Sequence, residues 1–276
     1  MFKDYIRLIR PKHMLKNVYV LLPLVFGHAL TNGPVVLRVA IAFFAFGATA
    51  CIVYVMNDLK DVEKDRLHPT KRTRPIASGA VSPAGAMRLI AVLAVIVIAL
   101  GLIGRFDLNC WLCLVSYLII NIGSSFGLKD VPILDVAILT FGFLLRMLFG
   151  STVTGIAVSG WLYLTVMAVS FYMALGKRRN ELKHHSAEGR SVLKLYSYPF
   201  LDKNMQICLT LGIAFYALWS MQVETALGVG AMVWTVPLVL CICMKYSLSI
   251  EGDSDGDPVE VIYSDKILLA LLVVFA

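Results

Sequence analysis

Residues 89–104 read LIAVLAVIVIALGLIG, and residues 161–176 read WLYLTVMAVSFYMALG. Neither stretch contains a charged residue, and each approaches the roughly 17–25 apolar residues that cross a bilayer as a helix. Similar runs recur along the 276-residue chain, which is 59% hydrophobic and only 16% charged. Soluble domains are about 45–50% apolar and about 25% charged, so this composition excludes an ordinary soluble enzyme. Because the runs are continuous rather than alternating, a transmembrane β-barrel is excluded as well.

The apolar runs predict an all-α polytopic membrane protein, a bundle of nine transmembrane helices forming a single domain over residues 1–276. The runs lie at 15–31, 39–56, 88–104, 110–128, 133–150, 160–176, 205–223, 230–246 and 266–276. The last run would rise only about 16 Å at 1.5 Å per residue, which is too short for a hydrocarbon core of about 30 Å. We expect a half-span there, unless the chain continues.

Charged residues are distributed unevenly between the two sides of this bundle. With a cytoplasmic N-terminus, nearly all of the 25 Lys and Arg residues fall in cytoplasmic segments, and only Arg38 and Arg105 lie in the opposite loops. The acids follow the same division, although the positive-inside rule does not gather acids. The pattern predicts a multi-pass plasma-membrane protein with a polar cytoplasmic cap, where the N-terminus and active site lie. The acidic run 251–257 is interpreted as a solvated connection. No nucleic-acid partner is expected, and the sequence specifies no oligomeric state.

An acidic motif follows the second apolar run. Residues 57–65 read NDLKDVEKD, and at about 100° per residue one side of a helix would carry Asn57, Asp58, Asp61 and Asp65. Carboxylates crowded on one face repel one another unless a cation holds them. Because oxygen ligands favour Mg²⁺, these four side chains are predicted metal ligands, and Asp58 and Asp61 are also predicted to be catalytic. The alternative is a solvated helix end that neighbouring lysines neutralise.

A basic turn follows the acids directly. It contains Lys71, Arg72 and Arg74, while Pro75 and Gly79 keep it out of a continuous helix. Acids that bind a metal, followed by bases that bind anions, predict a diphosphate site. In such a site the metal and the cations together offset the charge of a leaving group.

The motif and the turn together resemble the first signature of the UbiA superfamily of intramembrane prenyltransferases. Residues 124–136, SSFGLKDVPILDV, lie where the second signature of that superfamily joins helices four and five. The chain is most similar to the branch of decaprenyl-phosphate phosphoribosyltransferases, which residues 10–17, RPKHMLKN, and 176–182, GKRRNEL, also resemble. The resemblance implies a UbiA-type bundle of nine helices with polar cytoplasmic caps. One residue departs from the pattern, because Ser125 stands where relatives commonly have Tyr, four residues before Lys129.

The resemblance implies transfer of the 5-phosphoribosyl group from phosphoribosyl diphosphate (PRPP) to a polyprenyl phosphate such as decaprenyl phosphate. Diphosphate would be released, and the product would be a pentose donor for cell-wall synthesis. The accepting phosphate is already anionic near neutral pH, so it needs no strong general base. Asp135 is the catalytic candidate for stabilising positive charge on the ribose or contacting a hydroxyl group. Lys129 is the candidate phosphate contact.

Two further basic clusters are candidate substrate contacts, because two anionic substrates need many cations. Arg10, Lys16 and Asn17 lie at the entry of the first apolar run, and Lys177 and Arg178 lie at the exit of the sixth run. Guanidinium groups suit phosphate through their two parallel N–H donors. The alternative for both clusters is anchoring to lipid headgroups.

Arg146 lies eleven residues after Asp135, about 16 Å deeper along a helix. A charge at such depth costs about 2.5–3.5 kcal/mol on insertion scales, so it is expected to face the bundle interior or a wet cavity. We predict that Arg146 lines the substrate cavity. Snorkelling to the far interface is the alternative.

Two other functions remain open. A related enzyme could move a prenyl group from a polyprenyl diphosphate to an aromatic acceptor, such as 4-hydroxybenzoate or haem, with the same Mg²⁺ and basic turn. An ion transporter is less favoured, because transporter sites usually lie near the bilayer midplane and often accompany internal repeats. Here the polar residues gather at one interface.

Overall fold

The computed structural model describes residues 2–185, 191–227, 232–252 and 257–275, and every regular element within those ranges is a helix. The chain divides into two compact units. Unit 1 comprises Met1–Phe126 and Leu145–Ala157, and unit 2 comprises Gly127–Leu144 and Val158–Ala276. Helix α7 (Leu134–Thr154) begins in unit 2 and ends in unit 1. The single domain expected from the sequence stays a prediction.

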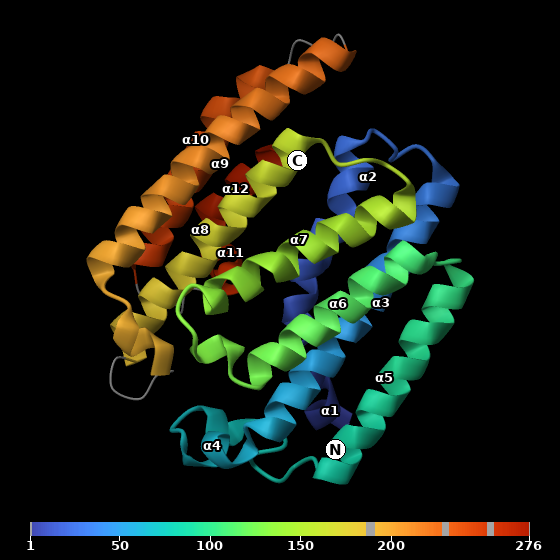
Figure 1. Ribbon diagram of the computed structural model, residues 1–276, viewed down its shortest axis with the longest axis vertical. Coiled ribbons are helices and arrows are strands. Elements are labelled where there is room, and N and C mark those ends of the chain that lie inside the picture. The colour runs from blue at the N-terminus through green and yellow to red at the C-terminus, as the bar shows by residue number, and fades with distance from the viewer. Residues whose placement is uncertain (1, 186–190, 228–231, 253–256, 276) are drawn as a thin grey trace. The chain divides into compact units, whose positions relative to one another are not determined.

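Unit 1 is built around the long helix α3. Its elements are α1 (Phe2–Ile9), the 3₁₀ helix η1 (Pro11–Leu21), α2 (Leu22–Phe26), α3 (Gly33–Lys60), α4 (Val62–Leu67), the 3₁₀ helix η2 (Lys71–Thr73), α5 (Pro83–Ile103), α6 (Leu108–Ser125) and the end of α7. Helix α3 packs against α5, α6 and η1, and the short helix α4 follows its end (Figure 1).

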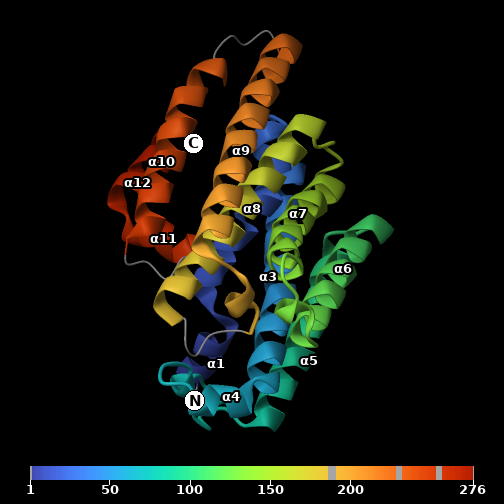
Figure 2. The same ribbon diagram turned by 60° about the vertical axis from the view of Figure 1, so that its left-hand side comes forward.

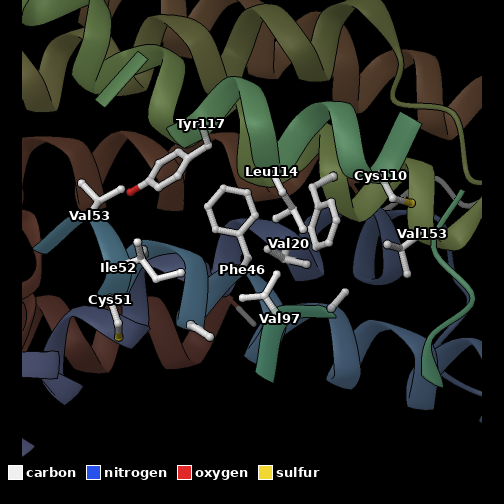
Figure 3. Packing of buried hydrophobic residues seen from close by; sticks show 14 of the residues in the cluster. Val20, Phe46, Cys51, Ile52, Val53, Val97, Cys110, Leu114, Tyr117 and Val153 are labelled. Carbon is white, nitrogen blue, oxygen red and sulfur yellow. The ribbon is translucent and has the colours of Figure 1, made fainter. Parts of the chain in front are cut away.

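Aromatic and branched side chains form the core of unit 1. The Phe46 ring of α3 lies 4.8 Å from the Tyr117 ring of α6 and 5.5 Å from the Phe149 ring of α7, measured between centroids. Figure 3 shows Phe46 between Tyr117 and Leu114. Phe46 and Phe149 are completely buried. Tilted and edge-on ring pairs of this kind add to the stabilisation from burial, so α3, α6 and the end of α7 are held together here.

Unit 2 is built around the pair α8 and α9. Its elements are the 3₁₀ helix η3 (Leu128–Asp130), the start of α7, α8 (Gly160–His185), the 3₁₀ helix η4 (Ser191–Leu195), α9 (Tyr198–Leu227), the 3₁₀ helix η5 (Met232–Thr235), α10 (Val236–Glu251), α11 (Pro258–Ser264) and α12 (Lys266–Phe275). Helices α8 and α9 run side by side, and α10 packs against α12 (Figure 2). The hydrophobic core of unit 2 includes Val136 of α7, Leu201 of α9 and Ile250 of α10.

Six helices are long and apolar enough to cross a membrane, counted over the described ranges. They are Gly33–Lys60, Pro83–Ile103, Leu108–Ser125, Leu134–Thr154, Tyr198–Val223 and Met232–Glu251. Helix α8 covers the predicted span 160–176 but is less apolar over its whole length, because it continues into the charged residues that follow Gly176. Helix α12 has only ten residues. The all-helical, multi-pass prediction therefore agrees with the described part of the chain.

The structure differs from the prediction over residues 15–31, where we expected one span. The 3₁₀ helix η1 ends at Leu21, and α2 follows with only five residues. Pro23 lies in the first turn of α2, where its missing N–H is tolerated. Gly27 ends α2, and a Cβ there would lie 2.5 Å from the Pro23 carbonyl oxygen. A proline at the start and a glycine at the end thus divide the expected span into short pieces.

Candidate active site

The acidic motif lies across a helix junction rather than on one continuous helix. Asp61 caps the end of α3, and α4 begins at the next residue. The Asp61 backbone has φ −88° and ψ 7°, yet its N–H still donates to the Asn57 carbonyl at 2.9 Å. The Asp65 N–H donates in turn to the Asp61 carbonyl at 2.8 Å. The chain therefore keeps turning through the motif, and both Asp58 and Asp65 become buried.

The two buried carboxylates of the motif share one guanidinium group. Arg74 Nη1 lies 3.2 Å from Asp58 Oδ1 and 2.7 Å from Asp65 Oδ2. Asp58 Oδ1 also accepts a hydrogen bond from Arg10 Nη2 at 2.6 Å. The Arg10 and Arg74 side chains are 27% and 30% exposed, whereas that of Asp58 is 3% exposed. Buried acids are thus held by arginines that remain accessible to solvent.

A small hydrophobic cluster holds the basic turn in place. Ile76 is 2% exposed and packs with residues that α1, α3 and α5 supply. Gly79 has φ +80°, a conformation that favours glycine. This packing presents Arg74 to the acids, while Lys71 and Arg72 are exposed on η2.

The end of α6 contacts the first residue of the motif. Ser125 donates its hydroxyl to Asn57 Oδ1, and the same Oγ lies 3.1 Å from the Asn121 carbonyl oxygen. Lys60 donates from Nζ to the Ser125 carbonyl, and this nitrogen lies 3.6 Å from the centroid of the Phe126 ring. Ser125 therefore connects α6 to Asn57.

Arg146 is buried within unit 1, at 4% exposed, among neutral and aromatic side chains. Its Nε donates to Asn17 Oδ1 at 2.9 Å, and its Nη2 donates to the Tyr117 hydroxyl at 3.1 Å. The guanidinium carbon lies 4.9 Å from the centroids of both the Phe46 and Tyr117 rings. Cation–π contacts of this kind stabilise a buried cation. The structure therefore brings together two predicted site residues, Asn17 and Arg146.

Two glycines allow η1 to approach α3 and α7 closely. A Cβ at Gly150 of α7 would lie 2.1 Å from the Val20 carbonyl oxygen. A Cβ at Gly47 of α3 would lie 2.4 Å from Met14 Cε and 3.1 Å from Asn17 Nδ2. Because the clash at Gly150 would be with backbone, glycine is required there for η1 to bring Asn17 to Arg146, whereas at Gly47 the flexible end of Met14 can move aside.

Unit 2 contains a second buried ionic group. Arg178 of α8 donates from Nε to Asp135 Oδ2 at 2.5 Å and from Nη1 to Glu181 Oε2 at 2.6 Å. The Tyr196 hydroxyl donates to Asp135 Oδ1 at 2.6 Å and accepts from the Ile133 N–H at 2.7 Å. Burial and the hydrogen bond to the Asp135 carboxylate raise the pKa of Tyr196 to about 12. Each oxygen of Asp135 thus has a donor.

The other predicted phosphate contacts of unit 2 lie outside this group. Lys177 Nζ lies 3.4 Å from Asp257 Oδ2. Asp257 is 6% exposed and accepts from the Val259 N–H at 3.0 Å, which caps α11. The interpretation of 251–257 as solvated is therefore wrong at Asp257, and residues 253–256 lie outside the described ranges. Lys129 is half-buried on η3.

The predicted site residues are distributed over both units. At the α3–α4 junction of unit 1 lie Arg10, Asn57, Asp58, Asp61, Asp65 and Arg74; elsewhere in unit 1 lie Lys16, Asn17, Lys71, Arg72 and Arg146; in unit 2 lie Lys129, Asp135, Lys177 and Arg178. Sequence reasoning missed Tyr117, Glu181 and Tyr196. The i,i+3 spacing of Glu181 from Arg178 was a usable signal, whereas the two tyrosines lie 29 and 61 residues from Arg146 and Asp135.

The donors at the α3–α4 junction fit Mg²⁺ in kind. They are one amide oxygen and carboxylate oxygens, and a single Arg74 nitrogen draws Asp58 and Asp65 together. No three His, Cys, Asp or Glu side chains form a metal-binding group in the described part of the chain. Proteins usually hold Mg²⁺ through one or two carboxylates, water and substrate phosphates rather than through a cage of protein ligands alone. The junction therefore suits a metal that a phosphate ligand accompanies.

Comparison with protein families identifies the fold. The model of the UbiA prenyltransferase family matches residues 20–259, a stretch with residues from both units. The chain belongs to the UbiA prenyltransferase family. The family predicted from the motif at Asn57–Asp65 is therefore confirmed.

Two relatives of this UbiA protein have the same name. The decaprenyl-phosphate phosphoribosyltransferase of Corynebacterium glutamicum is 38% identical over 284 residues, covering 98% of this chain and 84% of the relative. The decaprenyl-phosphate phosphoribosyltransferase of Mycolicibacterium smegmatis is 32% identical over 282 residues, covering 96% of this chain and 88% of the relative. The similarity thus extends over nearly the whole chain.

A solved structure shares the fold. The UbiA homolog from Archaeoglobus fulgidus bound to GPP and Mg²⁺ superposes with a TM-score of 0.74 at 18% identity, covering 99% of this chain and 97% of that one. At this identity the likeness establishes the UbiA fold alone. The same homolog has also been solved bound to Cd²⁺. That homolog therefore binds divalent metals.

Proposed function

We propose that this UbiA-family protein transfers the 5-phosphoribosyl group of PRPP to a polyprenyl phosphate and releases diphosphate. The observation that carries the proposal is the 38% identity, over 98% of the chain, to a decaprenyl-phosphate phosphoribosyltransferase. The polar groups at the α3–α4 junction are of the kind that such a reaction needs. Decaprenyl phosphate is the proposed acceptor, and the product is a pentose donor for the cell wall.

In this reaction a phosphate oxygen of the lipid forms a bond to the anomeric carbon of the ribose, and the bond from that carbon to the diphosphate oxygen breaks. The attacking phosphate is already anionic near neutral pH, so a strong general base is unnecessary. The protein must instead stabilise the leaving diphosphate and the positive charge that develops on the ribose.

The α3–α4 junction is the proposed diphosphate site. The candidate Mg²⁺ ligands are Asn57, Asp58, Asp61 and Asp65, from which the ion would take one or two carboxylates together with phosphate oxygens and water. When bound, Mg²⁺ offsets the charge of the departing diphosphate and fixes its orientation. Arg10 and Arg74 contribute guanidinium groups at the same junction, whose donors match phosphate oxygens. Lys71 and Arg72 extend the positive charge onto the exposed turn.

Arg146 is proposed to line the cavity for the anionic substrates, together with Asn17 and Lys16. A cation inside a membrane bundle normally faces the bundle interior or a wet cavity. The hydrogen bonds from Arg146 to Asn17 and Tyr117 orient the guanidinium group.

In unit 2, Asp135 is proposed to stabilise positive charge on the ribose or to contact one of its hydroxyl groups. Arg178 and Tyr196 hold its two oxygens in fixed directions. Since Arg178 is 1% exposed and also binds Glu181, we assign it to positioning Asp135 instead of the phosphate contact predicted from the sequence. Lys129 and Lys177 are the more accessible candidates for phosphate contact.

The proposed membrane arrangement has nine crossing or partly crossing segments. It adds α8, the η1–α2 segment and α12 to the six long apolar helices. The strong excess of Lys and Arg in alternate loops supports a cytoplasmic N-terminus and a cytoplasmic site in the plasma membrane.

The test is an incubation of the purified protein in detergent with Mg²⁺ and ribose-labelled PRPP, with and without polyprenyl phosphate. Lipid-soluble label that forms only with the polyprenyl phosphate supports the proposal. If label stays in the aqueous phase while a polyprenyl diphosphate reacts with 4-hydroxybenzoate, the protein is an aromatic prenyltransferase instead.

A further inference from the structure

The ion pairs at the α3–α4 junction indicate how this site is filled. Building on the proposed function, we infer that Arg10 and Arg74 couple the metal to the diphosphate. The junction binds a divalent cation tightly only together with a diphosphate, because both arginines exchange their carboxylate partners for phosphate oxygens.

The acids of the junction already have cationic partners. Asp58 Oδ1 accepts from Arg10 at 2.6 Å and from Arg74 at 3.2 Å, and Asp65 Oδ2 accepts from Arg74 at 2.7 Å. A divalent cation that takes these oxygens displaces the guanidinium groups and leaves them next to a further positive charge. Like charges at such short range repel, so binding of the metal alone is opposed.

A diphosphate removes this obstacle. Arg10 and Arg74 are 27% and 30% exposed, so both guanidinium groups are accessible to a ligand from solvent. Each can direct its parallel N–H donors to phosphate oxygens, which are strong acceptors. Asp58 and Asp65 are then released for the metal. Each ligand thereby creates the site that the other one needs, and the two affinities must rise by the same factor.

The donor geometry supports the same inference. The described residues contain no group of three acidic, His or Cys side chains that could hold a metal. Magnesium sites with one or two carboxylates are usually completed by phosphate oxygens and water. The diphosphate therefore supplies metal ligands as well as partners for the two arginines.

The inference makes an unusual prediction about Arg74→Gln. This substitution removes the arginine partner of Asp65 and one of the two arginine partners of Asp58, so the metal alone binds more tightly. At the same time the diphosphate loses a partner, and the coupling between the two ligands falls. A residue that only contacts phosphate would leave binding of the metal alone unchanged, and a residue that only maintains the fold would weaken both ligands.

The test measures binding rather than turnover. Mn²⁺ is titrated into the purified full-length protein in detergent, with and without inorganic diphosphate, and free Mn²⁺ is followed by electron paramagnetic resonance. A protein-free titration corrects for the Mn²⁺–diphosphate complex. We expect diphosphate to tighten Mn²⁺ binding to the wild type by a factor within the usual coupling range of about 5–150. Arg88→Gln is the matched control, because Arg88 is exposed on α5 and donates to the Ala84 carbonyl of its own helix.

For Arg74→Gln we expect tighter binding of Mn²⁺ alone than in the wild type and a smaller effect of diphosphate. Arg10→Gln removes one of the two arginine partners of Asp58, so we expect the same directions of change in a smaller amount, and it replaces Arg74→Gln if that variant does not fold. Arg74→Lys keeps the charge and retains part of the coupling. Unchanged or weaker binding of Mn²⁺ alone in both glutamine variants overturns the inference.

The binding test and the transfer assay fail separately. Coupled binding of Mn²⁺ and diphosphate without transfer from PRPP would overturn the proposed reaction and leave the role of the arginines in place. Transfer from PRPP without coupled binding of Mn²⁺ and diphosphate would overturn the role of the arginines and leave the proposed reaction in place.

Discussion

Both units contain a buried aspartate held by arginine, and the two pairs differ in how accessible the arginine is. Arg74, the partner of Asp58, is 30% exposed, whereas Arg178, the partner of Asp135, is 1% exposed. An accessible guanidinium group can change partners when a charged ligand arrives. A fully buried one is fixed, because leaving either charge unpaired in the interior is costly. The difference separates a pair suited to binding from a pair suited to positioning.

The largest effect is expected when the buried pair is broken. Arg178→Gln leaves Asp135 and Glu181 without their cation, which typically destabilises a protein by about 3–5 kcal/mol. The measurement is thermal unfolding in detergent. Arg179→Gln is the neighbouring control, because its partner Asp202 is 42% exposed and such pairs contribute about 0–1 kcal/mol. An equal fall in melting temperature in both variants would contradict the distinction between fixed and exchangeable ion pairs.

The second-largest effect is expected at the α3–α4 junction of unit 1, on the rate of turnover. Asp61→Ala removes a proposed metal ligand that lies between α3 and α4, so we expect turnover to fall by about 10²–10³-fold, the loss typical of one preorganised group. Folding, checked by gel filtration and circular dichroism, should be unaffected. Glu63→Ala is the control, since Glu63 is 79% exposed on α4. Metal-dependent activity retained in Asp61→Ala would contradict the ligand assignment.

A smaller effect is expected from Tyr196→Phe. The substitution removes the donor to Asp135 Oδ1 and the acceptor of the Ile133 N–H. A hydrogen bond to a charged group contributes about 1.5–3 kcal/mol, so the melting temperature should fall by less than in Arg178→Gln. The rate of phosphoribosyl transfer should fall as well, because Asp135 loses one of its two fixed contacts. A variant with the wild-type rate and stability would show that Tyr196 does not position Asp135.

Tyr196 also makes the stability of the folded protein depend on pH in the alkaline range. Burial and the Asp135 carboxylate raise the pKa of Tyr196 from 10.0 to about 12, so the folded protein favours the neutral phenol. The resulting stabilisation is fully present below pH 10 and is lost as the pH rises towards 12. The difference in melting temperature between the wild type and Tyr196→Phe should therefore shrink across this window. A difference that stays constant or grows would refute the assigned cause.

The smallest effect is expected at Ser125. Ser125→Ala removes the hydroxyl that binds Asn57 Oδ1, and a neutral hydrogen bond contributes about 0.5–1.5 kcal/mol. The Mg²⁺ concentration for half-maximal activity should rise about two- to tenfold, with little change in the maximal rate. Ser124→Ala is the adjacent control. A lower maximal rate at an unchanged Mg²⁺ requirement would argue against a role in orienting Asn57.

Much of the fold follows from composition, because long apolar runs have few alternatives to membrane helices. The predicted runs at 39–56, 88–104 and 110–128 each lie largely within an observed helix. The prediction of one span at 15–31 was wrong, because the apolarity of the run does not show that Pro23 and Gly27 divide it into short helices. Apolar periodicity also did not indicate the helix junction at Asp61, because most residues around it are charged.

The candidate site was predictable to the extent that its residues are neighbours in the chain. The acids and Arg74 lie within one short segment, so their charges alone suggested a common site. The contact of Arg10 with Asp58 joins residues 48 positions apart, and that of Arg146 with Asn17 joins residues 129 positions apart. Such contacts depend on how α1, η1 and α7 pack, and no local pattern encodes that packing. The hydroxyl partners Tyr117 and Tyr196 were missed for the same reason.

The close approach at Gly150 makes natural variation at this position informative. Alanine for glycine is among the mildest exchanges in a lipid-embedded segment, yet here the extra methyl group would meet the Val20 carbonyl oxygen at 2.1 Å. To relieve that clash η1 must retreat, and the retreat would carry Asn17 away from Arg146. A population of homologous genes should therefore show Gly150 replaced rarely, and replaced only where neighbouring side chains have shrunk to make room.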